Sequence, residues 1–201
     1  ESLSNEVRSV CEDKQGNLWV GLKDGMIRLY DSNRKFIGHL TGNGTISMTG
    51  TPMEGTAYFI MQDSKGIIWI ATKGNGLVRA EQISPTVFIN HRNNLKGYPI
   101  DVCYKARFIT SDNNGRLWVG TTTGAVAFDE NFKKPEDIQF HHFSRVPNDT
   151  KSLSNNDVHW IIATQQKELY LATFGGGLNK LISISENGHG EFKSYSVLDG
   201  L

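Results

Sequence analysis

Several side chains that could do chemistry recur at fixed spacing along the chain. Asp13, Asp63 and Asp112 each stand six residues before a tryptophan. Carboxylates in such a series could bind calcium or act as acid–base groups. Each of them, however, begins the pattern Asp-x-x-Gly, in which the Asp side chain bonds its own backbone and the glycine supplies a positive φ. We therefore expect these carboxylates to be turn residues.

The aromatic residues that follow the carboxylates form a second series. They are separated by 50, 49 and 52 residues and comprise Trp19, Trp69, Trp118 and Tyr170. They could be sugar-stacking platforms, but each lies within an apolar run such as Leu18–Val20. A continuous apolar run indicates a strand that is buried on both faces. We therefore expect the three tryptophan rings to lie in the core between neighbouring sheets.

The histidines and cysteines do not form a recognisable catalytic or metal-binding pattern. His39 and His91 occupy the repeat position held elsewhere by aromatic residues, so we expect them to be strand residues. His141 and His142 are adjacent and should point to opposite faces of a strand. The only cysteines, Cys11 and Cys103, lack metal-ligand spacing. Two free thiols are expected, with a bridge left open, and no cofactor or metal is expected.

The spacing of these residues defines four repeats of about 50 residues. A further aromatic series recurs every 52 residues and is expected to lie in the fourth strand of each repeat; it comprises Phe36, Phe88, Phe140 and Phe192. The repeats span approximately 1–46, 47–97, 98–149 and 150–201, and each reads as four short strands separated by turns. Four antiparallel strands in a repeat of this length are typical of β-propeller blades. The fold expected is therefore all-β, with four propeller blades.

The repeat motif resembles a known family. DNNGRLWVGTTTG at 112–124, DSKGIIWIATKGNG at 63–76 and SLSNNDVHWI at 152–161 resemble the two-component regulator propeller repeat. The resemblance implies a non-catalytic periplasmic sensor region of a hybrid two-component system from Bacteroidetes. It also implies detection of an oligosaccharide, and a histidine kinase and regulator elsewhere in the parent protein. The fourth repeat departs from the motif at Thr164, Lys167 and Tyr170.

The repeat phase also bears on assembly. Leu3, Leu153 and Leu201 stand at the same phase of the repeat. We expect four blades of a larger propeller, for example one of seven blades, with a closed four-bladed ring as the alternative. Terminal blades of a fragment would expose apolar faces, which favours self-association.

The long connections between the fourth strand of one repeat and the first strand of the next are the expected functional loops. In a propeller they emerge on the same face as the turns between second and third strands. Amides, hydroxyls, bases and aromatic rings gathered there suit a sugar. The expected ligand-binding residues are Lys23, Lys73, Asn75, Arg92, Asn94, Tyr98, Thr122, Asn155, Asn156 and Phe174.

Composition narrows the function further. Lys plus Arg and Asp plus Glu each number 21, so the net charge is zero. A neutral chain is not expected to bind nucleic acid, and without a long apolar run this segment should make no membrane contact. Two other functions remain open: a propeller enzyme of the streptogramin-lyase type, and a protein-interaction scaffold.

Overall fold

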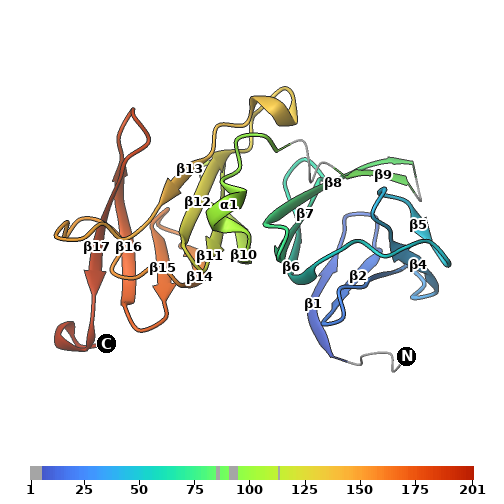
Figure 1. Ribbon diagram of the computed structural model, residues 1–201, viewed down its shortest axis with the longest axis horizontal. Helices are drawn as coiled ribbons and strands as arrows, with labels where there is room; N and C mark the ends of the chain where they lie inside the picture. The colour runs from blue at the N-terminus through green and yellow to red at the C-terminus, as the bar shows by residue number, and fades with distance from the viewer. Residues whose placement is uncertain (1–5, 85–86, 91–94, 113) are drawn as a thin grey trace. The chain divides into compact units, whose positions relative to one another are not determined.

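The computed structural model describes residues 6–84, 87–90, 95–112 and 114–201. The chain divides into two compact units, Glu1–Lys96 and Gly97–Leu201, each containing two antiparallel sheets (Figure 1). The expected all-β architecture of propeller blades is confirmed. None of the helices in the described residues is long and apolar enough to span a membrane.

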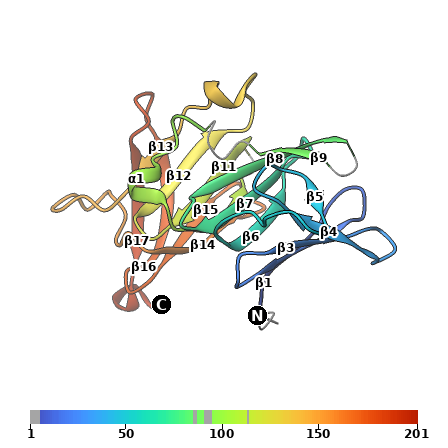
Figure 2. The same ribbon diagram turned by 45° about the vertical axis from the view of Figure 1, so that its right-hand side comes forward.

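In the first unit, a five-stranded sheet packs on a four-stranded one. The strands of the first sheet are β1 (Val7–Glu12), β2 (Leu18–Leu22), β3 (Ile27–Tyr30), β4 (Phe36–Leu40) and β5 (Ile46–Ser47). Those of the second are β6 (Thr56–Gln62), β7 (Ile68–Lys73), β8 (Leu77–Ser84) and β9 (Val87–Asn90), drawn in order in Figure 2. The first sheet exceeds the expected four strands, because part of the long connection after His39 folds back and pairs with β4.

The second unit contains two four-stranded sheets and three short helical segments. The strands are β10 (Ala106–Ser111), β11 (Arg116–Thr121), β12 (Gly124–Asp129), β13 (His141–Phe143), β14 (Val158–Ala163), β15 (Leu169–Thr173), β16 (Gly177–Ile184) and β17 (Gly190–Tyr195). The helical segments are α1 (Ile100–Cys103), η1 (Pro135–Asp137) and η2 (Val197–Asp199). Strands follow one another in sequence order within each sheet.

The core lies where the sheets pack together, as the apolar runs predict. Trp19, Trp69 and Trp118 are each 0% exposed, which confirms that they are core residues. In the first unit, Trp19 belongs to a cluster that also contains Ile60 and Ile70 of the second sheet. Burial of such side chains stabilises the fold by about 1.5–3 kcal/mol each.

The phenylalanine series is only partly placed in fourth strands. Phe36 and Phe192 lie in β4 and β17, but Phe140 lies directly before β13. Its ring packs on Phe128 at 4.9 Å and on Tyr98 at 5.5 Å between ring centroids. The expectation that Phe140 is a strand residue was wrong, because a long connection with its own helical turn delays the start of β13.

Candidate functional site

Three of the aspartates form the same turn, and every turn fixes a tryptophan. The Oδ2 atoms of Asp13, Asp63 and Asp112 accept the indole N–H of Trp19, Trp69 and Trp118 at 2.9, 2.8 and 3.0 Å. In each turn Oδ1 accepts the backbone N–H groups two and four residues later. The prediction of turn residues is confirmed, with an additional role in holding the buried ring.

In the first unit, the expected ligand residues are partly engaged by the protein itself. The Lys23 ammonium donates to the Glu6 carboxylate at 2.7 Å, and this bond lowers the pKa of Glu6. Asn75 Nδ2 donates to Glu54 O at 2.6 Å. Lys73 is exposed at the end of β7. Arg92 and Asn94, like His91, lie outside the described residues.

In the second unit, Tyr98 offers no exposed ring to a ligand. It is 5% exposed, and its hydroxyl donates to Cys103 O at 2.9 Å. This burial raises the pKa of Tyr98 strongly. Thr122 is half-buried, and its N–H donates to Lys105 O.

The two predicted asparagines shape the loop before β14. Asn155 Oδ1 accepts the backbone N–H of Asp157 at 2.9 Å. Asn156 Oδ1 accepts that of Arg145 at 2.6 Å. Both side chains are half-buried, and these bonds leave their Nδ2 groups as the atoms able to meet a ligand.

Phe174 is the predicted residue with the most open ring, at 69% exposed. It stacks beside the His159 ring, with centroids 5.5 Å apart and planes 20° apart. His159 Nε2 is 3.4 Å from Asp157 Oδ2. Arg107 holds the same carboxylate in a bidentate bond, from Nε at 2.9 Å and Nη2 at 3.2 Å. We name Arg107, Asp157, His159 and Phe174 the loop-end cluster.

Local structure explains why these four side chains meet. Arg107 and His159 occupy equivalent places near the start of β10 and β14, the first strands of two neighbouring blades. Phe174 begins the turn after β15, and its N–H donates to Asp157 O at 2.9 Å. Gly175, in that turn, and Gly177, at the start of β16, have φ of 75° and 76°, which glycine adopts without strain.

The loop-end cluster combines a flat exposed surface with hydrogen-bonding groups. An aromatic ring pair provides apolar contact area, and a guanidinium and a carboxylate provide donors and acceptors at its edge. Sequence reasoning identified Phe174 and missed Arg107, Asp157 and His159. The available signal was the place of Arg107 and His159 on the first strands of their repeats, with Asp157 directly before the second of these strands.

His39 and the two cysteines are not members of this cluster. His39 is in β4, as predicted, and its Nε2 donates to Gly50 O at 2.5 Å. Cys11 and Cys103 are both free thiols in the structure. Burial favours the neutral thiol of Cys103, but hydrogen bonds with His142 and Thr123 outweigh it and lower its pKa. Among the described residues, no three His, Cys, Asp or Glu side chains gather to hold a metal.

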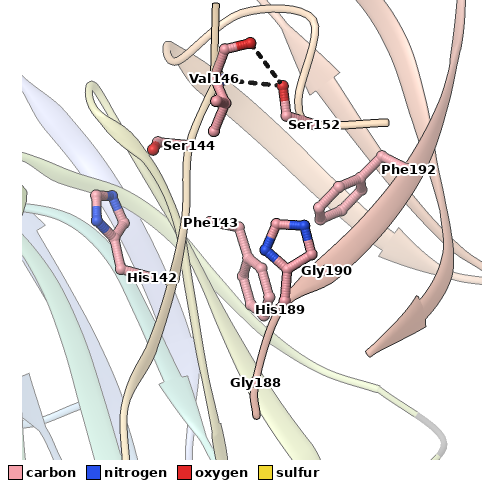
Figure 3. A pocket seen from close by; sticks show the side chains of 9 residues that line it. All are labelled: His142, Phe143, Ser144, Val146, Ser152, Gly188, His189, Gly190 and Phe192. Atoms are coloured by element: carbon pink, nitrogen blue, oxygen red, sulfur yellow. Dashed lines mark hydrogen bonds between the residues drawn. The ribbon is translucent and has the colours of Figure 1, made fainter. Parts of the chain in front are cut away.

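A small pocket lies between β13 and the turn before β17. Figure 3 shows the rings of Phe143, His189 and Phe192 turned toward the same space. Its volume is about 90 Å³. That is well below the roughly 300–1,000 Å³ of small-molecule sites. This pocket therefore does not suit an oligosaccharide.

Comparison with known proteins supports the resemblance of the repeat motif to the two-component regulator propeller repeat. The sequence model of the two-component regulator propeller matches residues 2–24. Histidine kinase P4 of Formosa agariphila is 27% identical over 124 residues, covering 61% of this chain and 9% of the kinase. The chain therefore spans a small part of that relative.

Solved structures share the fold at lower identity. The extracellular domain of a hybrid two-component system from B. thetaiotaomicron matches with a TM-score of 0.63 and 20% identity, covering 99% of this chain and 23% of that one. Virginiamycin B lyase from Staphylococcus aureus matches with a TM-score of 0.59 and 16% identity, covering 96% and 57%. Sensor domains and lyases thus share this blade architecture. The chain therefore has the fold of β-propeller blades, and its residues 2–24 match the two-component regulator propeller repeat.

Proposed function

We propose that this chain is the non-catalytic, extracytoplasmic sensing part of a hybrid two-component system, and that its ligand is an oligosaccharide. The loop-end cluster is the observation that carries the proposal. The similarity to a histidine kinase and to an extracellular sensor domain is consistent with this role. The periplasm is the proposed compartment.

The chemistry of the cluster favours a sugar over other small ligands. Phe174 presents an open ring, against which the apolar face of a pyranose can stack. The Asp157 carboxylate and the Arg107 guanidinium lie at the same end of the sheet and are only partly covered. Planar groups of this kind can each contact two neighbouring hydroxyls. The Nδ2 atom of Asn155 adds a donor beside them.

Two further parts of the proposal concern the partners. A ligand at the strand ends would change how the blades contact the rest of the sensor, and a kinase in the parent protein would read that change. Self-association through sheet faces is also proposed, because large apolar side chains such as Ile162 and Ile182 are each 52% exposed.

Binding to a defined panel of sugars tests the proposal. The chain is titrated by calorimetry with maltohexaose, cellohexaose, xylohexaose and laminarihexaose. We expect at least one to bind, and Phe174→Ala to weaken that binding about tenfold or more, the effect of losing an aromatic stacking contact. Tyr104→Ala is the matched control, because Tyr104 is another exposed ring of the same unit.

Three results would contradict the proposal. The first is that no sugar binds, and the second is that the Phe174→Ala and Tyr104→Ala variants bind equally well. The third is turnover of virginiamycin B by the chain, which would indicate a lyase and replace the sensing role.

A further inference from the structure

The connection between β12 and β13 is unusual among the equivalent connections. It comprises residues 130–140, eleven residues, whereas 31–35 and 185–189 join the third and fourth strands of the first and fourth blades with five residues each. It contains the short helical segment η1. Connections that are long for their place in a compact domain tend to serve a function.

This connection forms one wall of a cleft of about 390 Å³. Arg116, at the start of β11, and Asp129, at the end of β12, are cross-strand partners and line its sheet side. Phe132, Lys133 and Asp137 line the loop side, and His141 closes one end. The volume falls within the roughly 300–1,000 Å³ range of small-molecule sites.

The cleft is separate from the loop-end cluster. Strand β11 runs from Arg116 at the cleft to Thr121, and the residue that follows it is the repeat equivalent of Phe174. The two sites therefore lie at opposite ends of their strands. A ligand in the cleft would not touch the residues of the proposed function.

Hydrogen bonds hold the loop in place. The N–H of Glu130 donates to Gly115 O at 2.9 Å, and that of Asn131 donates to Asp129 Oδ1 at 2.6 Å. Ile138 is 3% exposed and anchors the loop beneath the cleft. A site anchored in this way loses little entropy when a ligand binds.

The cleft contains two cationic and two anionic side chains, and no ion pair joins them among the described residues. Among the described residues, Arg116 and Lys133 form no ion pair with any carboxylate. The Asp137 carboxylate likewise accepts no bond from a cation there. The cleft therefore offers free positive groups for an anion and free acceptors for hydroxyl groups.

We propose that this cleft binds an acidic sugar unit, a hydroxyl-rich ring that carries one anionic group. A guanidinium binds a carboxylate or sulfate in a bidentate manner, and Arg116 with Lys133 supplies that half of the site. Asp129 and Asp137 accept hydroxyl protons, and the half-buried Phe132 ring lies against the sugar. The two carboxylates restrict the ligand to one anionic group per unit, because they repel a densely charged chain.

Titration with matched probes tests this inference. The chain is titrated by calorimetry at low salt with digalacturonate, galactose 6-sulfate, cellobiose and a fully sulfated disaccharide. We expect digalacturonate or galactose 6-sulfate to bind at least tenfold more tightly than the other two. Digalacturonate alone indicates a carboxylate ligand, and galactose 6-sulfate alone indicates a sulfate ligand.

Three variants assign the binding to the cleft. Arg116→Gln combined with Lys133→Gln is expected to reduce affinity at least tenfold, and replacing 130–140 with the sequence of 31–35 should abolish binding. Lys35→Gln, in the short equivalent connection, is the control and should bind normally. Circular dichroism and a thermal melt check that each variant is folded.

The outcomes separate this inference from the proposed function. If Phe174→Ala abolishes binding of the acidic probes and the cleft variants retain it, the acidic sugar binds at the loop-end cluster and the inference is overturned. If no acidic probe binds the unmodified chain, it is overturned as well. Binding of neutral hexasaccharides at the loop-end cluster is unaffected by either result.

Discussion

In three repeats the first turn contains an aspartate that accepts the indole N–H of a buried tryptophan. In the fourth repeat a threonine takes the place of the aspartate, and a partly exposed Glu–Lys pair lies beside the tyrosine that replaces the tryptophan. In the third repeat, Asp112 accepts two backbone N–H groups and the indole N–H of Trp118. In the fourth, Thr164 Oγ1 accepts the N–H of Glu168 at 3.2 Å. The Glu168 carboxylate accepts the Tyr170 hydroxyl at 3.0 Å and pairs with the Lys180 ammonium.

The different burial of the two aromatic rings explains why the turns of the third and fourth repeats differ. The indole of Trp118 is fully buried, so its N–H must find a partner inside the protein or be left unsatisfied. Tyr170 is only half-buried, and its hydroxyl donates to the Glu168 carboxylate. The partly solvated Glu168 carboxylate is a sufficient hydrogen-bond acceptor for this hydroxyl, so no aspartate is required in the turn. The aspartate is therefore required both to accept the indole N–H of the buried tryptophan and to accept the backbone N–H groups of the turn.

Removing the ring in both repeats should give the largest difference. Trp118→Ala is expected to lower the free energy of unfolding by about 3–5 kcal/mol, the cost of deleting a large core aromatic. Tyr170→Ala should cost less than half of that, because part of its surface is already in water. Urea denaturation followed by circular dichroism measures both. Equal losses would show that the two rings contribute alike and would undo the comparison.

Removing the acceptor should give the next largest difference. Asp112→Ala leaves a buried indole N–H and two turn N–H groups without their acceptor, so we expect a loss of about 1–3 kcal/mol. Thr164→Ala removes the hydroxyl that accepts the Glu168 N–H at a half-buried turn and should cost about 0.5–1 kcal/mol. The same urea titrations apply. An Asp112→Ala variant as stable as the Thr164→Ala variant would argue against a role in fixing Trp118.

The backbone of the turn offers a smaller test. Lys167 has φ of 62° where the first three repeats have glycines, Gly16, Gly66 and Gly115, at 82°, 86° and 80°. A residue with a Cβ is strained in this region, so Lys167→Gly should stabilise the chain by up to about 1 kcal/mol. Gly115→Ala should destabilise it by a similar amount. Thermal melts measure both, and a destabilising Lys167→Gly substitution would contradict the strain.

The fold could be predicted from the sequence because each repeat of about 50 residues contains the same local turn and strand motifs. The apolar runs around Trp19 and Trp118 predicted strands and burial correctly. Strand β5 and helix α1 were not foreseen, because each is short and depends on partners that the local sequence does not reveal. The connection after His39 was accordingly expected to be a loop.

The candidate site was less accessible from sequence for a related reason. Phe174 follows from its place in a glycine-rich turn. Arg107 and Asp157 come together across 50 residues, from neighbouring repeats, and no local pattern pairs them. The sequence did not predict the cleft beside Arg116, because the long connections from a fourth strand to the next first strand were the expected functional loops. The unequal lengths of the third-to-fourth connections were the signal available.

The ionic group of the fourth turn should give the smallest effect. The Lys180 ammonium, through its hydrogen bond, lowers the pKa of Glu168. A carboxylate with a lowered pKa stabilises the folded chain above its ordinary pKa of about 4.3, and this contribution is lost as the pH falls through the lower folded value. Glu168→Gln should therefore lower the melting temperature slightly at pH 7, and the difference from the unmodified chain should disappear at more acidic pH. Because the pair is partly solvated, added salt should also shrink that difference. Melts at pH 7 and at pH 3, each at low and high salt, measure it. A difference that persists at pH 3 would mean that Glu168 acts through packing, and the fourth turn would then resemble the other three more closely than its hydrogen bonds indicate.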